Sequence, residues 1–239
     1  MQIFSLSTRV SYDDIDLNMN LSLKGALRFM QEAAMLHSGL AGYSVGDVDR
    51  THVTWMLVQW RVRLLEKILW GEEVTVNTWP RSMERATSIR NFELIGPDNK
   101  VAAIGESNWV LVNTNTGRIT RITPEVASAY ELNERDVFDE PLPEIAAGGG
   151  EITWKAIVGR RDIDTNHHVN NRVYLDYAKE ALPESVSELP FREVSVRYRK
   201  QLLLGDAVQC RYSCHNGAHT VDICGENSSI VHGTVVFYE

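Results

Sequence analysis

The chain has few cysteines, and none is placed for a metal site or an evident disulfide. Its 239 residues include three, Cys210, Cys214 and Cys224, an odd number confined to the C-terminal end. Zinc sites need paired Cys or His ligands at short, regular spacings, which neither these residues nor the scattered histidines make. We therefore expect reduced thiols that are mostly buried among other small hydrophobic side chains, and no metal site.

Long apolar runs and an excess of positive charge are also missing. No stretch approaches the roughly 20 apolar residues of a membrane-spanning helix, and the start, MQIFSLSTRV, lacks the apolar core of a signal peptide. The formal net charge of −8 argues against a nucleic-acid-binding protein. With 44% hydrophobic and 23% charged residues, the composition is that of a globular protein. For such a chain we expect no membrane span and a cytoplasmic location.

What the sequence does contain is a duplicated motif. Residues 14–23 read DIDLNMNLSL, and residues 162–171 read DIDTNHHVNN, 148 positions later. The two stretches share Asp, Ile, Asp and Asn at their first, second, third and fifth positions, and at the seventh position Asn20 of the first copy is replaced by His168 in the second. A duplication in which only one copy carries the histidine predicts one working site and one that has lost its chemistry.

Each motif is followed by a helix and then by strands. Residues 23–34 and 171–182 place apolar side chains at helical spacing, with Ser22 and Asn170 as the expected N-caps. Stretches rich in Val, Thr, Ile and aromatic residues then predict strands. These are expected at 73–80, 86–95 and 101–113 in the first copy, and at 207–214, 219–225 and 229–238 in the second.

A second matched block pairs residues 60–76 with residues 194–210, at a spacing of 134. The shorter spacing means that the first copy carries about 14 extra residues between its helix and its strands. The pattern indicates an α+β fold in which each copy wraps a long antiparallel sheet around one helix. Prolines and glycines in residues 139–151 mark a linker. We therefore expect domains at 1–138 and 152–239.

In these features the chain resembles the acyl-acyl carrier protein (acyl-ACP) thioesterases, a family of plant plastid enzymes with bacterial relatives. The resemblance rests on DIDTNHHVNNRVY in the second copy and on WGEEVTVNTW, SNWVLVNTNTGR and ITPEV in the first. It implies a tandem (double) hotdog fold with a silent N-terminal copy that shapes the acyl pocket and a catalytic C-terminal copy. It also implies a thiolester hydrolase of fatty acid biosynthesis that cleaves fatty acyl-ACP to free fatty acid and carrier, without a cofactor.

The resemblance places the catalytic residues at Asp164, Asn166, His168 and Gln201. Histidine can accept a proton from water near neutral pH, Asp164 can orient the imidazole or take the proton itself, and Asn166 can hold the water or the thioester carbonyl. The family's Y-R-R-E stretch reads YRKQ here, so Gln201 stands where the family has a glutamate, and glutamine cannot act as a base. We also expect the helix that starts near Asn170 to offer N–H groups to the oxyanion.

Several alternatives stay open. The same hydrolysis could act on acyl-CoA, a related fold could dehydrate 3-hydroxyacyl groups, and Gln201 favours a non-catalytic acyl-binding module. Asp164 could be architectural, since Asp residues before a helix often make turn and cap hydrogen bonds. Arg160, Arg161 and Arg199 predict either a docking rim for an acidic carrier or a merely solvated face. The sequence decides neither the acyl chain length nor whether strand edges pair into a homodimer.

Overall fold

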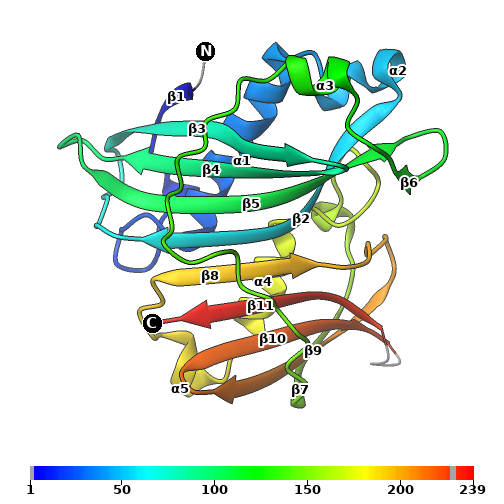
Figure 1. Ribbon diagram of the computed structural model, residues 1–239. Coiled ribbons are helices and arrows are strands. Elements are labelled where there is room, and N and C mark those ends of the chain that lie inside the picture. Colours follow the sequence, from blue (N-terminus) through cyan, green and yellow to red (C-terminus); the bar gives the residue numbers. More distant parts are fainter. Residues whose placement is uncertain (1–2, 227–229) are drawn as a thin grey trace. The chain divides into compact units, whose positions relative to one another are not determined.

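Stretches rich in Val, Thr and aromatic residues form antiparallel strands in both halves of the chain (Figure 1). The structure is a computed structural model that describes residues 3–226 and 230–239. It divides into two units, Met1–Leu142 (unit 1) and Pro143–Glu239 (unit 2). Within the described ranges, no helix combines the length and the apolar character that crossing a bilayer requires.

Unit 1 is an antiparallel sheet with one long helix across one of its faces (Figure 1). Its strands lie in the order β1-β3-β4-β5-β2, and the short β6 pairs with β5. The strands are β1 (Phe4–Arg9), β2 (Val53–Leu64), β3 (Glu73–Glu84), β4 (Thr87–Ile95), β5 (Val101–Asn113) and β6 (Arg118–Ile119). The helices are η1 (Tyr12–Asp14), α1 (Leu23–Leu40), η2 (Val45–Asp47), α2 (Val48–Thr51) and α3 (Pro124–Ser128).

Unit 2 repeats this plan with a shorter helix. Its strands lie in the order β8-β11-β10-β9-β7, and α4 contacts β10 and β11. The strands are β7 (Glu151–Ile157), β8 (Glu193–Tyr198), β9 (Ala207–His215), β10 (Ala218–Gly225) and β11 (Val231–Tyr238). The helices are η3 (Arg160–Asp162), α4 (Val173–Glu180) and α5 (Glu184–Ser187). The thiols are free, with Cys210 and Cys224 buried and Cys214 exposed.

The α+β class and the strands expected from the sequence are confirmed, with small shifts at their ends. β4 and β5 match the expected 86–95 and 101–113 closely, and β3 runs past residue 80 to Glu84. Residue 229, the expected start of the last strand, lies outside the described residues. The expected N-cap at Ser22 is confirmed, because its Oγ accepts the N–H of Gly25 at 3.0 Å. The expected N-cap at Asn170 is wrong, because α4 begins only at Val173.

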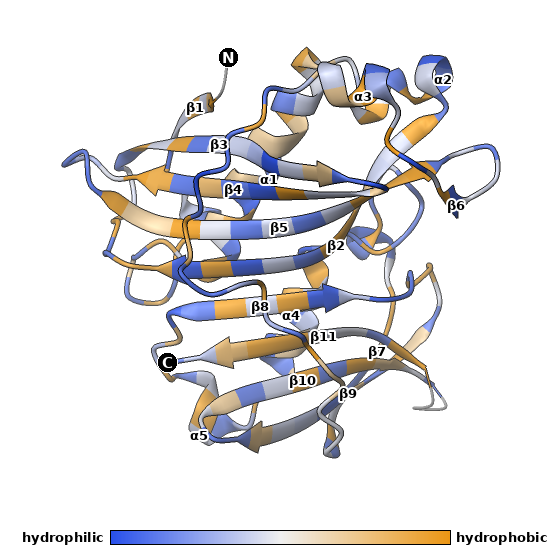
Figure 2. Ribbon diagram, viewed as in Figure 1, coloured by the Kyte–Doolittle hydropathy of each residue, from blue (hydrophilic) through white to orange (hydrophobic). Residues whose placement is uncertain are grey.

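Helix α1 supplies the centre of the unit 1 core. It carries hydrophobic and hydrophilic residues side by side along its length (Figure 2), which lets one face pack on the sheet. The side chains buried on that face to 1% exposure or less are Ala26, Leu27, Phe29, Met30 and Ala33. The sheet contributes Trp60 and Phe92, whose ring centroids lie 4.9 Å apart. Each large side chain buried here stabilises the fold by about 1.5–3 kcal/mol.

The segment after α3 crosses the opposite face of the unit 1 sheet (Figure 1). Trp79 Nε1 and Asn91 Nδ2 donate to the carbonyl of Arg135 at 3.0 and 2.8 Å. The Arg135 guanidinium donates to both carboxylate oxygens of Glu93, at 2.7 and 2.9 Å, and lies 4.2 Å from the centre of the Trp79 ring. A planar guanidinium satisfies both contacts at once, so this segment is held to the sheet.

The residues that open unit 2 are likewise bound to its sheet. Asp222 of β10 is fully buried and accepts the N–H of Gly149 at 2.9 Å and the hydroxyl of Thr234 at 2.8 Å. The Arg199 guanidinium donates to Thr234 Oγ1 at 2.7 Å and to the carbonyl of Ile145 at 2.8 Å. Arg199 thus anchors this segment, and we remove it from the docking rim expected from the sequence.

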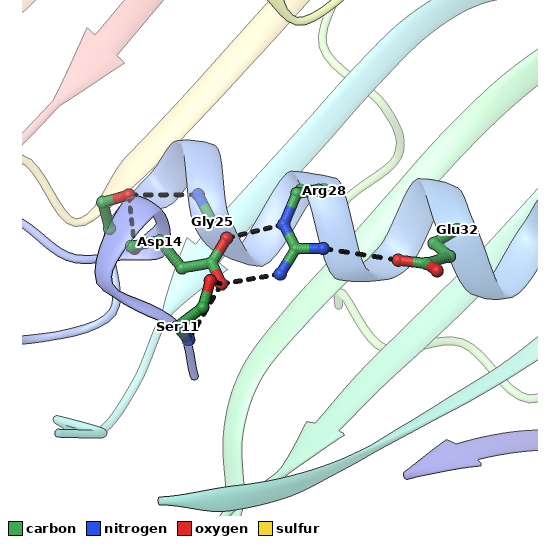
Figure 3. Close-up of polar contacts among 6 residues, drawn as sticks. Ser11, Asp14, Gly25, Arg28 and Glu32 are labelled. Atoms are coloured by element: carbon green, nitrogen blue, oxygen red, sulfur yellow. Dashed lines mark hydrogen bonds and ion pairs between the residues drawn. The ribbon is translucent and has the colours of Figure 1, made fainter. Parts of the chain in front are cut away.

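A buried carboxylate closes the turn between β1 and α1 (Figure 3). Asp14 is 1% exposed and accepts two hydrogen bonds of 2.6 Å from the Arg28 guanidinium. It also accepts the N–H and the hydroxyl of Ser11, at 3.1 and 2.5 Å. Burial alone would raise the pKa of Asp14, but the hydrogen bonds from Arg28 and Ser11 outweigh burial and lower it.

Gly25 lets the helix start directly against this turn. The N–H of Ser22 donates to the carbonyl of Asp14 at 2.8 Å, and a Cβ atom on Gly25 would lie 2.4 Å from the same oxygen. A larger residue at position 25 would therefore push the helix away from the turn. The matching residue of the second copy is Val173, and there the helix starts later, at Val173 itself.

We predict that Asp14→Asn destabilises the protein by about 2–4 kcal/mol, because it leaves the Arg28 guanidinium without its buried partner. Glu32→Gln is the control, since Glu32 is 53% exposed and lies 3.4 Å from Arg28, and an exposed pair contributes under about 0.5 kcal/mol. Urea unfolding of the three proteins measures both effects. The folded pKa of Asp14 is lowered, so the gap should persist above pH 3.8 and close as the pH falls through the folded pKa. Equal stabilities at neutral pH would contradict the prediction.

A second buried charge lies between α1 and the sheet of unit 1. Arg90 of β4 is 5% exposed, and its Nη1 lies 3.0 Å from His37 Nδ1 and 3.2 Å from Thr78 Oγ1. Burial, together with the charge of Arg90, lowers the pKa of His37 to about 4. His37 is therefore neutral at pH 7, and its Nδ1 accepts the hydrogen bond from Arg90.

This cluster predicts a pH dependence of stability. The folded pKa of His37, about 4, lies below the ordinary value of 6.5, so the unfolded chain binds a proton in this window that the folded protein does not. Stability should fall as the pH is lowered from about 6.5 to about 4, by up to about 1.4 kcal/mol per pH unit. His37→Gln should remove this slope, whereas His215→Gln, which changes an exposed histidine, should keep it. A His37 imidazole that titrates near pH 6.5 by NMR would rule this account out.

Candidate active site

The two copies of the duplicated motif fold into the same loop. In the first copy, the N–H of Asp16 donates to the carbonyl of Asn20 at 2.8 Å. In the second copy, the N–H of Asp164 donates to the carbonyl of His168 at 3.0 Å. His168 therefore takes the place of Asn20 in this backbone bond. The first copy has two further bonds, from the Asn20 N–H to Asp16 Oδ1 at 3.0 Å and from Asn20 Nδ2 to the carbonyl of Asn18 at 3.2 Å.

The Asp164 carboxylate helps to hold this loop. Its Oδ1 accepts the N–H of Asn166 at 2.8 Å, the bond that Asp16 makes with Asn18 in the first copy at 2.9 Å. The architectural role left open by the sequence is therefore present. The same oxygen lies 3.9 Å from His168 Nδ1, too long for a hydrogen bond but close enough for electrostatic attraction to a charged imidazole.

His168 is partly buried, and its Nε2 makes no hydrogen bond with the residues that the structure describes. Its side chain is 22% exposed and that of Asp164 is 20% exposed. His168 Nδ1 lies 3.5 Å from the carbonyl of Val169, so both nearby acceptors favour the tautomer with hydrogen on Nδ1. In that tautomer Nε2 carries the lone pair that can accept a proton. Asn166 is exposed at the tip of the same loop.

Gln201 lies beside the loop through its backbone. The N–H of Val169, next to His168, donates to the carbonyl of Leu202 at 2.8 Å. Leu202 is fully buried, whereas Gln201 is exposed. In the part of the chain that the structure describes, the Gln201 side chain makes no hydrogen bond to Asp164 or His168. The structure thus brings three of the expected residues together in one loop and places the fourth on the neighbouring segment.

Three side chains that sequence reasoning missed hold this neighbouring segment. Tyr174 Oη donates to the carbonyl just before Gln201 at 3.2 Å, and His232 Nδ1 lies 2.9 Å from the carbonyl of Gln201 itself. Tyr198 Oη donates to the carbonyl of Asn171 at 2.9 Å. Tyr198 and Tyr174 both stood in recognised motifs, as the first residue of YRKQ and the last residue of DIDTNHHVNNRVY, whereas His232 stood near none.

The expectation that a helix starting near Asn170 offers its N–H groups to an oxyanion needs correction. Helix α4 begins at Val173, and the N–H of Val173 donates to the carbonyl of Asn170 at 2.9 Å. The N–H of Arg172 donates to Asn170 Oδ1 at 3.0 Å. Because the Asn170 side chain and carbonyl already occupy these two groups, the Asn166 amide becomes the better candidate to hold the thioester oxygen.

Residues 2–130 match the family described as "Acyl-ACP thioesterase N-terminal domain", and residues 151–233 match "Acyl-ACP thioesterase C-terminal domain". The chain belongs to the acyl-ACP thioesterase family. The two matches follow the two copies of the motif, so the family's domains correspond to the duplication read from the sequence. Among the described residues, no group of His, Cys, Asp or Glu side chains is arranged to hold a metal ion.

Plant members of the acyl-ACP thioesterase family are identical to this chain at about a quarter of the aligned residues. Oleoyl-acyl carrier protein thioesterase 1 of Arabidopsis thaliana is 24% identical over 242 residues, which cover 92% of this chain and 65% of that protein. A palmitoyl-acyl carrier protein thioesterase of Cuphea hookeriana is 26% identical over 215 residues, which cover 83% of this chain and 52% of that protein. The chain thus spans between half and two thirds of the length of these relatives.

Solved structures of the thioesterase family share the fold. An acyl-ACP thioesterase from Bacteroides thetaiotaomicron superposes with a TM-score of 0.89 at 21% identity, covering 100% of this chain and 98% of that one. The 12:0-ACP thioesterase from Umbellularia californica gives a TM-score of 0.84 at 19% identity, covering 100% and 97%. These likenesses confirm the double hotdog fold expected from the sequence.

Proposed function

We propose that this chain hydrolyses the thioester of fatty acyl-ACP and releases a free fatty acid and the carrier protein. The observation that carries the proposal is the loop of the second copy, which brings together the His168 imidazole, the Asp164 carboxylate and the Asn166 amide. Membership of the acyl-ACP thioesterase family supports the substrate class. The plant relatives, whose names refer to oleoyl and palmitoyl carrier protein, support an acyl chain of fatty-acid length.

In the proposed reaction, His168 Nε2 takes a proton from a water molecule as the water oxygen attacks the thioester carbonyl carbon. The tetrahedral intermediate collapses with cleavage of the carbon–sulfur bond, and the imidazolium returns its proton to the leaving thiolate. The products are the fatty acid and the carrier thiol. A positioned histidine base of this kind contributes about 10²–10⁴-fold in rate.

Asp164 and Asn166 assist from the same loop. The Asp164 carboxylate lies 3.9 Å from His168 Nδ1 and so stabilises the imidazolium that forms during the reaction. Its hydrogen bond with the N–H of Asn166 fixes the loop around the histidine. The exposed Asn166 amide can donate to the carbonyl oxygen as negative charge develops there, which is the role of an oxyanion hole.

Gln201 favours an alternative function, in which the protein binds acyl groups without cleaving them. Its amide can hold the attacking water by hydrogen bonds but cannot remove a proton from it. If the chemistry required a carboxylate at this position, the natural chain would bind acyl-ACP and leave it intact. Turnover assays with matched acyl-ACP and acyl-CoA distinguish hydrolysis of either substrate from binding alone.

We predict that His168→Asn lowers kcat by about 10²–10⁴-fold without unfolding the protein. Asparagine is the residue of the first copy at this place, where the loop keeps its backbone bonds. The control is His167→Met, because Met19 holds the matching position with φ 62°, against 63° at His167. Hydrolysis of acyl-ACP and thermal unfolding are measured for both variants. Near-native turnover in His168→Asn would remove His168 from the mechanism.

We predict that the natural protein already hydrolyses acyl-ACP and that Gln201→Glu changes the rate only modestly. A carboxylate beside the loop would favour the charged form of a nearby imidazole. The acidic limb of the pH–rate profile should therefore move to higher pH. Profiles of the two forms decide the matter. A gain of several orders of magnitude in Gln201→Glu would contradict the proposed mechanism and support the acyl-binding role for the natural chain.

A further inference from the structure

A group of exposed apolar side chains lies beside the His168 loop in unit 2. Ile157, Leu203 and Leu204 are 65%, 50% and 54% exposed. Backbone hydrogen bonds hold their two segments together, because the N–H of Gly205 donates to the carbonyl of Val158 at 3.1 Å. The neighbouring carbonyl of Leu202 accepts the N–H of the residue that follows His168, at 2.8 Å. Backbone bonds therefore join the segments that carry these apolar side chains to the loop that carries His168.

Basic side chains border this apolar group. Arg160 and Arg161 lie in η3, shortly after Val158, and Lys200 lies between the end of β8 and Leu203. All three are exposed, and the Arg161 side chain is 93% exposed. We call these three cations and the three apolar residues Ile157, Leu203 and Leu204 together the Leu203 face.

The first copy supplies an internal comparison on the same backbone. There the N–H of Gly71 donates to the carbonyl of Val10 at 3.0 Å, which matches the bond between Gly205 and Val158. The three cations of the second copy are replaced by Tyr12, Asp13 and Glu66. The first copy also has two cations, Arg9 and Lys67, at the positions of Ile157 and Gln201. Their positive charges equal the negative charges of its two acids, so the matched positions of the first copy carry no net charge. Positive charge therefore gathers at the matched positions only in the copy that carries the histidine.

We propose that the Leu203 face is the docking surface for the acyl carrier protein. This inference rests on the proposed function, since a carrier that delivers its thioester to His168 has to dock on a surface near the loop. The partner is a protein with carboxylates around an apolar contact, because opposite charges guide association and the apolar side chains supply contact area. The phosphates of a coenzyme would pair with the cations but leave Ile157, Leu203 and Leu204 uncovered.

The test is the double variant Arg160→Tyr/Arg161→Asp, which installs the residues of the first copy at equivalent backbone positions. Arg118→Glu is the control, since Arg118 is an exposed residue of β6 in unit 1. Each protein is assayed with one acyl chain carried by ACP, by CoA and by N-acetylcysteamine, a small uncharged thiol. For the double variant we expect kcat/KM on acyl-ACP to fall about tenfold, mainly through KM, and to depend less on salt.

The three substrates separate the outcomes. Turnover of the N-acetylcysteamine thioester should change less than twofold in the double variant, and Arg118→Glu should match the natural protein on acyl-ACP. An equal loss on acyl-CoA would identify a phosphate site and overturn the proposal, as would an unchanged KM for acyl-ACP. If the natural protein hydrolyses none of the three, the proposed function fails. In that case, calorimetric binding of acyl-ACP to the same variants still tests the Leu203 face, and equal affinities would overturn it.

Discussion

The rest of the structure depends on a buried aspartate that turns the chain from its first strand into its helix in each copy. The carbonyls of Asp14 and Asp162 accept the N–H groups of Ser22 and Asn170, each at 2.8 Å. Their carboxylates accept the N–H of the residue three positions earlier, at 3.1 and 2.8 Å. One residue thus ties together the strand end, the motif loop and the start of the helical segment. A buried carboxylate without these donors would be costly, which makes the turn an all-or-none feature.

The two copies satisfy the rest of this carboxylate differently, and this difference reaches the site. In unit 1 the partner is the charged Arg28, and α1 starts close to the turn because Gly25 permits the approach. In unit 2 the hydrogen-bond partner is the hydroxyl of Tyr177, at 2.9 Å from Asp162, and the only cation paired with Asp162 among the described residues is the largely exposed Arg161, at 3.6 Å. The helix there starts only at Val173, so the residues just after His168 form a short turn. The second copy therefore has a less helical segment after His168 than the first copy has after Asn20.

The sequence predicted the duplication, the fold class and most strands, because these follow from residue type and spacing. The N-cap predicted at Ser22 is correct and the one predicted at Asn170 is wrong, although serine and asparagine are both good N-cap residues. The difference lies at Gly25 and at Val173, which stands at the matching position of the second copy. The residue there determines how closely the helix can approach the turn, and this contact in space cannot be read from the spacing of residues in the sequence. The same limit applies to Arg199. Its place in the sequence predicts a docking rim or a solvated face, yet its guanidinium binds the carbonyl of Ile145 in another segment.

The chemistry of the site can change while its fold stays the same, because loops that differ in their side chains share the same backbone bonds. The bonds that the two loops share come from main-chain groups and from Asp16 or Asp164, so the shared bonds form with either asparagine or histidine at the position of His168. The same holds for Gln201, whose side chain is exposed while the buried Leu202 and its carbonyl hold the segment in place. Replacing a glutamate by glutamine there alters charge and proton affinity but removes no contact that the fold requires. Such a departure from the family can persist at no cost in stability, so its effect is expected in the pH dependence of the reaction and not in the folding of the protein.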